Sequence, residues 1–258
     1  MKSRTLGSRD SDSPLDIETD RRVFLSAEWR DLVMLNYEVD PALLHPYVPR
    51  GVELDAFDGQ SFASLVGFRF LGTKLLGLLA VPFHTNFDEV NLRFYVRRRE
   101  GEENRRGVVF IRELVPHFAI ARLARIAYGE KYDSCPMQHE IARTETAISA
   151  AYEWQFGGQR FRLDAEASGA PNYVAENSLD NFITEHYWGY SARADGMSIE
   201  YRVSHDRWRI WTAAKSGFDG NAADLYGSDF AEILRRPPDS AFIAEGSAVV
   251  VHKGRRII

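Results

Sequence analysis

The sequence predicts a mainly β or α+β protein, and three observations lead to that class. The 258 residues are 45% hydrophobic and 27% charged, which is ordinary globular composition. Several segments alternate apolar and polar residues, as half-buried strands do, most clearly over 89–99. Few stretches have helical spacing. Many strands with two to four short helices are therefore expected.

Segments with strand composition or alternation run along the whole chain. They are 31–39, 52–57, 61–70, 89–99, 107–114, two strands within 141–163, 198–203, 207–214 and 241–252. Asp58-Gly59 and Gly157-Gly158 are turn dipeptides, so each is expected to close a hairpin. The polar run GEENRRG predicts the turn between the strands at 89–99 and 107–114.

Three segments favour helix. Asp40 is expected to cap a short helix that begins at Pro41. Residues 116–128 have apolar residues at helical spacing. Residues 178–187 form a further candidate, with Ser178 or Asn177 as its cap.

One domain is expected from about residue 21 to 258. Residues 1–20 are rich in Ser, Asp and Arg and have little apolar content, which predicts a disordered tail. No internal repeat or low-complexity linker follows. A chain of this length buries a sizeable core, and β-rich proteins often reach it as one domain.

Charge and cysteine usage exclude several classes. A formal net charge of -5 is not the basic footprint of a nucleic-acid-binding protein. Cys135 is the only cysteine, so no intrachain disulfide can form, and a small buried hydrophobe is favoured over a nucleophile. The N-terminal segment lacks the apolar core of a signal peptide, and the longest apolar stretch, 75–83, is too short to span a bilayer. A cytoplasmic location without membrane association is expected.

Metal and cofactor motifs are missing from the sequence. The seven histidines include no His-x-x-x-His pair, and there is no cysteine cluster. No Gly-x-Ser-x-Gly elbow and no glycine-rich phosphate loop occur. The sequence therefore predicts neither a metal site nor a cofactor.

Several motifs follow one another in a fixed order. They are Trp29–Asp31, Val48–Asp55, Phe87–Val96 with Gly107–Phe110 after a turn, Ser178–Tyr187 and Val203–Trp208. In this order they resemble the YqjF-like family over roughly residues 24–253. The resemblance implies an acetoacetate decarboxylase-like fold, a cone-shaped and largely antiparallel β-barrel with a few short helices. It also implies a small-molecule pocket.

In acetoacetate decarboxylases a buried lysine forms a Schiff base with the substrate. The corresponding segment here is 124–132, where Tyr132 takes the lysine position and Lys131 lies one residue early. One residue along a strand reverses the face on which a side chain lies. The resemblance therefore implies loss of Schiff-base chemistry, and an exposed surface role is favoured for Lys131 over a catalytic one.

The same resemblance suggests other site residues. Glu89 matches the pocket glutamate and is the candidate general acid or base. Arg30 lies in the segment of the decarboxylase arginine, which makes it a ligand-binding candidate. Arg125 matches a family Ala-Arg pair, for which a structural salt bridge is the alternative.

Asn91 and Arg93 lie two and four residues after Glu89, so the three side chains are expected on one face of a strand. Asp88 is expected on the opposite face and not to share a proton with Glu89. A buried arginine needs a partner, and a carboxylate is the natural one. That carboxylate could belong to the protein or to an acidic ligand, so a structural ion pair and a ligand site both stay open.

Two function classes follow. The first is an enzyme that acts on a small oxo or carboxylic acid without the Schiff-base lysine, with Glu89 as acid or base and Arg93 or Arg30 on a carboxylate. The second is a non-catalytic protein that binds or senses a small apolar acid. A homo-oligomeric scaffold is a third alternative.

Overall fold

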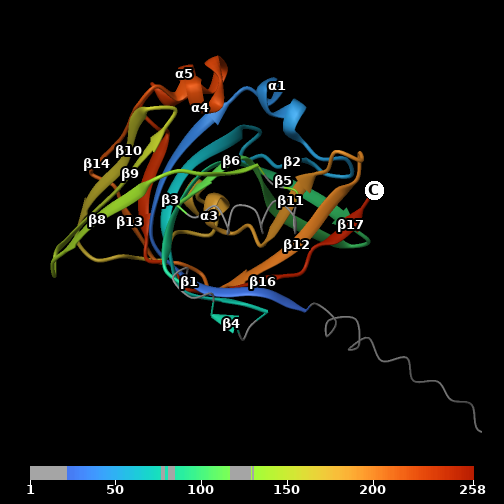
Figure 1. Ribbon diagram of the computed structural model, residues 1–258, viewed down its shortest axis with the longest axis horizontal. Coiled ribbons are helices and arrows are strands. Elements are labelled where there is room, and N and C mark those ends of the chain that lie inside the picture. Colours follow the sequence, from blue (N-terminus) through green and yellow to red (C-terminus); the bar gives the residue numbers. More distant parts are fainter. Residues whose placement is uncertain (1–21, 77–78, 81–84, 117–128, 130) are drawn as a thin grey trace, which may run out of the picture.

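The computed structural model describes residues 22–76, 79–80, 85–116, 129 and 131–258. These residues form many strands and a few short helices, which confirms the predicted class (Figure 1). The strands are β1 (Val23–Val39), β2 (Glu53–Leu54), β3 (Ser61–Leu75), β4 (Leu79–Ala80), β5 (Phe87–Glu100), β6 (Glu103–Val115), β7 (Tyr132–Ser134), β8 (Met137–Arg143), β9 (Ala147–Phe156), β10 (Gln159–Ser168), β11 (Trp188–Ala192), β12 (Ser198–His205), β13 (Ile210–Thr212), β14 (Lys215–Asp219), β15 (Ser240–Ala244), β16 (Ala248–His252) and β17 (Arg255–Ile257). The helices are α1 (Pro41–Leu44), η2 (His45–Tyr47), α3 (Leu179–Thr184), α4 (Ala222–Tyr226) and α5 (Ser228–Leu234).

Strand pairing closes a ring. Successive neighbours are β1, β16, β12, β11, β6, β5 and β3, and β3 pairs back onto β1. All of these pairings are antiparallel except that between β6 and β11. The closed and largely antiparallel sheet implied by the family resemblance is therefore present.

A second sheet, β14-β10-β9-β8, packs against the outside of this ring. Apolar side chains from both sheets interdigitate between them, among them Leu65, Leu92 and Trp154. At Gly67 of β3, an added Cβ would lie 2.8 Å from the ring of Tyr152. A glycine there lets the two sheets approach.

The inside of the ring holds α3 (Figure 1). Phe182 and Ile183 of this helix pack with Met34, Val66 and Tyr95 of the surrounding strands. Ser178 caps the helix, since its Oγ accepts a hydrogen bond from the amide of Asn181 at 3.2 Å. The predicted helix is confirmed, although it ends at Thr184.

The predicted hairpin over 52–70 is only partly correct. Asp58 and Gly59 both have positive φ, 51° and 82°, as a tight turn requires. A single bridge, Phe57 with Gln60, closes that turn. β2 pairs with β5 instead of β3, because Glu53 lies opposite Arg97 and forms an ion pair with it at 2.9 Å.

Other predicted boundaries also shift. The strand expected over 241–252 is two strands, β15 and β16, because the chain turns at Gly246 with a φ of 75°. The strand expected over 207–214 covers only Ile210–Thr212, and residues 141–143 belong to β8. Most of GEENRRG is in β6, which leaves a tighter turn at Gly101. The predicted tail 1–20 and, apart from Pro116, the predicted helix over 116–128 lie outside the described residues.

The cap at Asp40 is confirmed, because its Oδ1 accepts from the amide of Ala42 at 2.8 Å and α1 begins at Pro41. The prediction that Cys135 is a small buried side chain is also confirmed, since this residue is 5% exposed. Burial raises the pKa of its thiol to about 12, so the thiol stays protonated at neutral pH.

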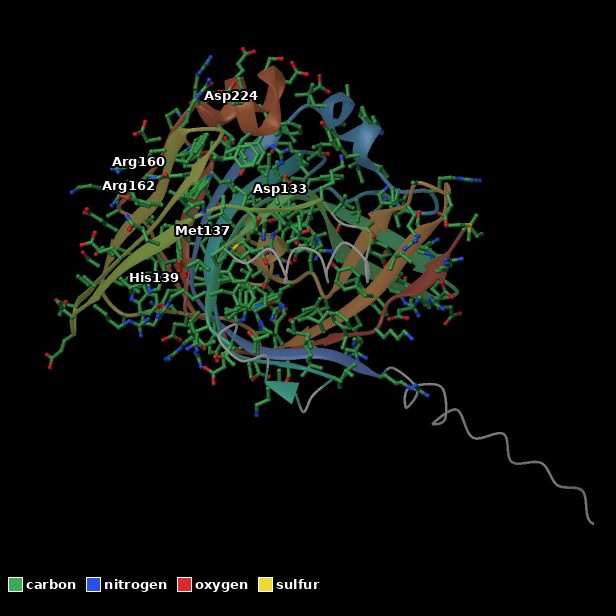
Figure 2. The ribbon with its side chains drawn as sticks, viewed as in Figure 1. Asp133, Met137, His139, Arg160, Arg162 and Asp224 are labelled. Atoms are coloured by element: carbon green, nitrogen blue, oxygen red, sulfur yellow. The ribbon has the colours of Figure 1, made fainter. Side chains whose placement is uncertain are left out.

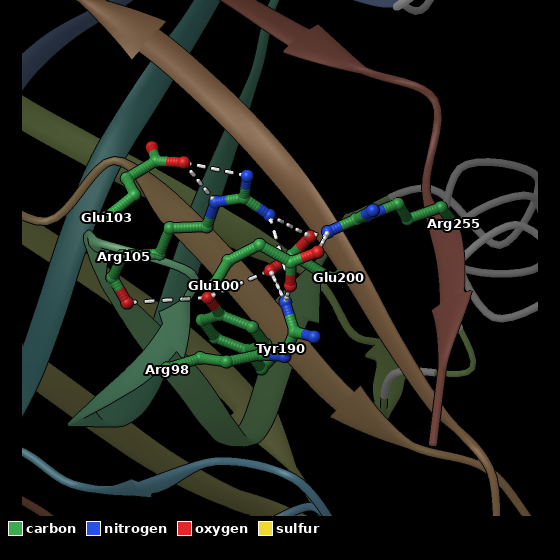
Figure 3. A network of polar contacts seen from close by, with 7 residues as sticks. All are labelled: Arg98, Glu100, Glu103, Arg105, Tyr190, Glu200 and Arg255. Carbon is green, nitrogen blue, oxygen red and sulfur yellow. Dashed lines mark hydrogen bonds and ion pairs between the residues drawn. The ribbon is translucent and has the colours of Figure 1, made fainter.

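One buried charge network ties the edge of the ring together (Figure 3). The carboxylate of Glu200 is fully buried and accepts from Arg98 at 3.2 Å, Arg105 at 3.0 Å and Arg255 at 2.7 Å. The hydroxyl of Tyr190 donates to the same group at 3.2 Å. The network links β5, β6, β11, β12 and β17, and each arginine in it has a carboxylate partner.

Candidate functional site

The odd-numbered residues of β5 face the inside of the ring. Glu89, Asn91 and Arg93 lie opposite Phe68, Val66 and Ser64 of β3, and directly paired residues share a face of a sheet. Phe68 and Val66 belong to the apolar cluster around α3. Burial is nearly complete, at 3%, 1% and 8% exposure for the three polar residues. The expected polar stripe inside the ring is thus present.

Glu89 and Asn91 form the first part of this stripe. Nδ2 of Asn91 donates to Oε1 of Glu89 at 2.9 Å. The hydroxyl of Tyr132, which stands where the family resemblance expects the lysine, lies 3.5 Å from the other oxygen of Glu89. Glu113 of β6 is opposite Asn91 and 1% exposed. Two carboxyl groups, an amide and a phenol therefore line one part of the interior.

Arg93 continues the stripe, and its environment is unusual. Among the described residues, no carboxylate forms an ion pair with its guanidinium, and its Nε is buried without a hydrogen-bond partner. Its guanidinium carbon is 5.9 Å from the ring centroid of Tyr95. A hydrogen bond with the Tyr95 side chain replaces part of the hydration that Arg93 loses on burial, but its charge has no carboxylate beside it.

Beside Tyr95 lies a histidine–aspartate pair. The ring of His186 is 4.6 Å from that of Tyr95, centroid to centroid, and its Nε2 lies 3.3 Å from Oδ2 of Asp55. Arg106 holds the same oxygen of Asp55 at 2.7 Å. The side chains of Asp55 and His186 are 6% and 2% exposed.

The pKa values of this pair move in the same direction for different reasons. Burial lowers the pKa of His186 to about 4, with the positive charges of Arg106 and Arg93 acting in the same direction against the opposing effect of Asp55. For Asp55, burial opposes ionisation, but hydrogen bonds from His186 and Arg106 outweigh it and lower the pKa to about 2. At neutral pH the pair is therefore a neutral imidazole that donates to a carboxylate.

A chain of hydrogen bonds anchors the other side of Tyr95. Its hydroxyl lies 2.5 Å from Oγ of Ser64, which donates to Oδ1 of Asn36 at 2.6 Å. Nδ2 of Asn36 in turn donates to Ser240 at 2.8 Å. Burial raises the pKa of Tyr95, and the charge of Arg93 with the bond to Ser64 opposes the rise. These neutral groups are satisfied, which fixes the ring against which Arg93 and His186 lie.

Asp88 and Glu89 face opposite ways, as predicted. Nδ1 of His139 lies 2.8 Å from a carboxylate oxygen of Asp88, and His139 belongs to β8 of the second sheet (Figure 2). Asp88 therefore joins the second sheet to the ring, while Glu89 belongs to the inner stripe.

The other predicted site residues are not brought together with this stripe. Arg30 pairs across the strands with Arg69, which is opposite Asp88, so Arg30 is on the face away from Glu89. Its guanidinium bonds Glu28 at 2.8 Å instead. Lys131 is exposed, with its amine 5.0 Å from the ring centroid of Tyr47. Arg125 lies outside the described residues.

His205 lies close to the inner apolar cluster. Its ring stacks on Trp208, with centroids 4.3 Å apart, and lies 4.7 Å from Tyr187. Nδ1 bonds the carbonyl of Asp206 at 2.9 Å, and burial lowers the pKa of this histidine. The aromatic neighbours indicate a packing role for the segment.

Sequence reasoning missed His186 and Asp55. The two residues are 131 positions apart, so no local motif joins them. Their only signal was that each lies within a segment that resembles the YqjF-like family.

Within the described ranges, no group of three or more His, Cys, Asp or Glu side chains could hold a metal ion. No helix among the described residues has the length and apolar composition that crossing a membrane requires.

Comparison with known proteins defines the class. The DUF2071 family, described as "Uncharacterized conserved protein (COG2071)", matches residues 26–248. The chain therefore belongs to the DUF2071 family. It is similar to "Uncharacterized protein YqjF" of Bacillus subtilis (strain 168), with 24% identity over 200 residues that cover 77% of this chain and 80% of that protein.

Solved structures agree on the fold. An acetoacetate decarboxylase-like enzyme from Sphingomonas wittichii RW1 has a TM-score of 0.61 at 14% identity, over 91% of this chain and 93% of that one. Acetoacetate decarboxylase from Legionella pneumophila has a TM-score of 0.60 at 12% identity, over 100% and 98%. The enduracididine biosynthesis enzyme MppR, complexed with the condensation product of pyruvate and imidazole 4-carboxaldehyde, has a TM-score of 0.62 at 14% identity, over 99% and 97%. The fold is acetoacetate decarboxylase-like.

Proposed function

We propose that the inner stripe of β5 binds a small oxo or carboxylic acid, with the carboxylate of the ligand on Arg93. The observation that carries this proposal is the buried guanidinium that has no ion pair among the described residues and an orphaned Nε. A ligand carboxylate supplies the charge and the acceptor that this group lacks. Fold relatives support the ligand class, since MppR is known in complex with pyruvate.

The site acts without an amine nucleophile. Lys74, Lys131, Lys215 and Lys253 are all exposed, and they are the lysines within the described ranges. Tyr132 is near Glu89 where the resemblance expects a lysine, and a phenol forms no iminium with a carbonyl. Chemistry at this site therefore runs through proton transfer, with Glu89 as the acid or base that lies beside the bound acid.

A non-catalytic binding or sensing role is the second candidate. The same guanidinium would hold the acid, and the aromatic and aliphatic side chains around α3 would cover its apolar part. The two candidates differ at Glu89. In the enzyme, Glu89→Gln abolishes turnover of a bound acid, whereas in a binding protein it changes affinity alone.

Calorimetric titration with pyruvate, acetoacetate and short fatty acids tests the proposal. The wild-type protein should bind at least one of these acids, and Arg93→Met should weaken that binding by roughly a hundredfold, the loss expected when a charged hydrogen-bond partner is removed. Arg30→Met is the matched control and should bind as the wild type does. Equal affinities of the wild type and Arg93→Met, or no binding of any of these acids, would contradict the proposal.

A further inference from the structure

Three buried polar atoms on the inner face have no hydrogen-bond partner among the described residues. They are Nε of Arg93, Oδ1 of Asn91 and Nδ1 of His186. The residues that carry them are 8%, 1% and 8% exposed. Buried polar groups are nearly always satisfied, so three orphans in one region indicate a missing partner.

The hydrogen-bonding role of each atom is fixed by its neighbour. Nδ2 of Asn91 donates to Glu89, so the orphaned Oδ1 is the amide carbonyl, an acceptor. Nε2 of His186 donates to Asp55, which Arg106 keeps ionised, so the orphaned Nδ1 carries a lone pair. The pKa of about 4 keeps His186 neutral at neutral pH, which preserves that lone pair. The set therefore contains one cationic donor and two neutral acceptors.

Arg93 is close to the residues that carry the two acceptors. Asn91 precedes it by two residues on the same face of β5. On the other side, Tyr95 contacts both Arg93, at 5.9 Å from its ring centroid, and His186, at 4.6 Å between centroids. The charge of Arg93 lowers the pKa of His186, as expected for a cation close to the imidazole. Arg93, Asn91 and His186 therefore form one neighbourhood around Tyr95.

We infer that this site prefers a hydroxy acid over the corresponding oxo acid, with Nδ1 of His186 accepting a hydrogen bond from the hydroxyl group of the ligand. The inference rests on the proposed function, since Arg93 still holds the carboxylate. The carbonyl oxygen of an oxo acid is an acceptor and leaves both protein acceptors unpaired. The hydroxyl group of a hydroxy acid donates to one of them.

Calorimetry with two matched pairs tests this preference: lactate against pyruvate, and β-hydroxybutyrate against acetoacetate, each hydroxy acid as separate enantiomers. The wild-type protein should bind one enantiomer of a hydroxy acid roughly tenfold more tightly than its oxo partner, as expected when an orphaned acceptor gains a donor. His186→Phe keeps the ring against Tyr95 and Phe182 but removes Nδ1. This variant should lose the preference and keep its affinity for the oxo acid.

His139→Phe is the control, because it removes another histidine–aspartate pair on the opposite face of β5. It should retain the preference for the hydroxy acid. Equal wild-type affinities for the two acids of each pair, or a preference that survives in His186→Phe, overturn the inference and leave the role of Arg93 intact. Failure of these four acids and of the short fatty acids to bind, or binding that Arg93→Met does not weaken, overturns the proposed function instead. Binding of short fatty acids alone overturns only the inference.

If the His186→Phe variant does not fold, a measurement on the wild-type protein tests the same inference. Nitrogen NMR of labelled histidine follows His186, whose ring is assigned through its contacts with Tyr95 and Phe182. Its Nδ1 should resonate as an unprotonated nitrogen in the free protein and shift when the hydroxy acid binds, with a smaller shift for the oxo acid. A protonated Nδ1 in the free protein overturns the inference.

Discussion

Two arginines of the same strand have opposite environments. Arg98 of β5 lies within the network of Glu200, where three arginines and three glutamates balance each other (Figure 3). Arg93, five residues earlier, lies inside the ring and has no ion pair among the described residues. Glu200, the carboxylate at the centre of that network, and Arg93 are both buried, so burial alone does not separate a structural charge from a binding one.

The two charged groups differ in whether the protein supplies ion-pair partners for them. A buried ion pair that has all its partners holds strands together, and removing one member leaves the others uncompensated. A buried charge without a partner costs stability in the free protein, and such a cost is typical of sites that bind ligands. We therefore assign the network of Glu200 to the fold and Arg93 to function.

The largest effect is expected from Glu200→Gln. Glu200 is fully buried and bonded to three arginines, so the variant should lower the free energy of unfolding by about 3–5 kcal/mol. Urea denaturation measures this loss. Glu103→Gln is the control, because that side chain is 55% exposed, and it should cost less than about 1 kcal/mol. Similar losses in both variants would mean that the network does not act as a unit.

Acid should destabilise the protein through His186. Its pKa is about 4 in the folded protein and 6.5 when unfolded, so the unfolded state binds more protons between these values and stability falls as the pH drops through this window. The difference corresponds to about 3 kcal/mol. Asp55, with its pKa lowered from 3.8 to about 2, adds a further loss below that window.

The measurement is the free energy of unfolding against pH for the wild type and His186→Phe. The variant should lack the loss between pH 6.5 and 4. Parallel curves would show that His186 titrates alike in both states, which would contradict its burial as a neutral acceptor.

Arg93→Met should stabilise the free protein by about 1 kcal/mol, because it removes a buried charge without breaking an ion pair. Arg105→Met, from the Glu200 network, should instead destabilise by about 3 kcal/mol. Thermal and urea denaturation without added acid compare the two. A loss of similar size in both variants would show that Arg93 has a structural partner.

The smallest effect is expected from borohydride reduction with acetoacetate. Because Lys131 is exposed and its amine lies against Tyr47, no ligand-sized mass gain that depends on Lys131 should form. Intact mass spectrometry of the wild type and Lys131→Ala reads the result. A gain that disappears in the variant would restore Schiff-base chemistry to this chain.

Local patterns predicted the strands and the inner stripe. Alternation along β5 was enough to put Glu89, Asn91 and Arg93 on one face, and the family resemblance was needed to expect that face inside the ring. The turn-like sequence around Lys131 was enough to expect an exposed side chain. The remaining site depends on contacts between distant segments. Nothing near Asp55 indicates that its partner is His186, and the match of a short segment could not show that Arg30 shares a face with Asp88.

The most direct test of ligand binding by Arg93 is to measure the hydrogen bonding of its side chain with and without a small acid. Heteronuclear NMR resolves the Nε–H groups of the arginines, and Arg93→Met assigns the signal. We predict that saturating acid shifts the Nε–H resonance of Arg93 and slows its exchange with water, while that of Arg105, already bonded to Glu103 at 2.7 Å, stays where it is. An Arg93 signal that no acid moves would contradict the assignment of this residue to ligand binding.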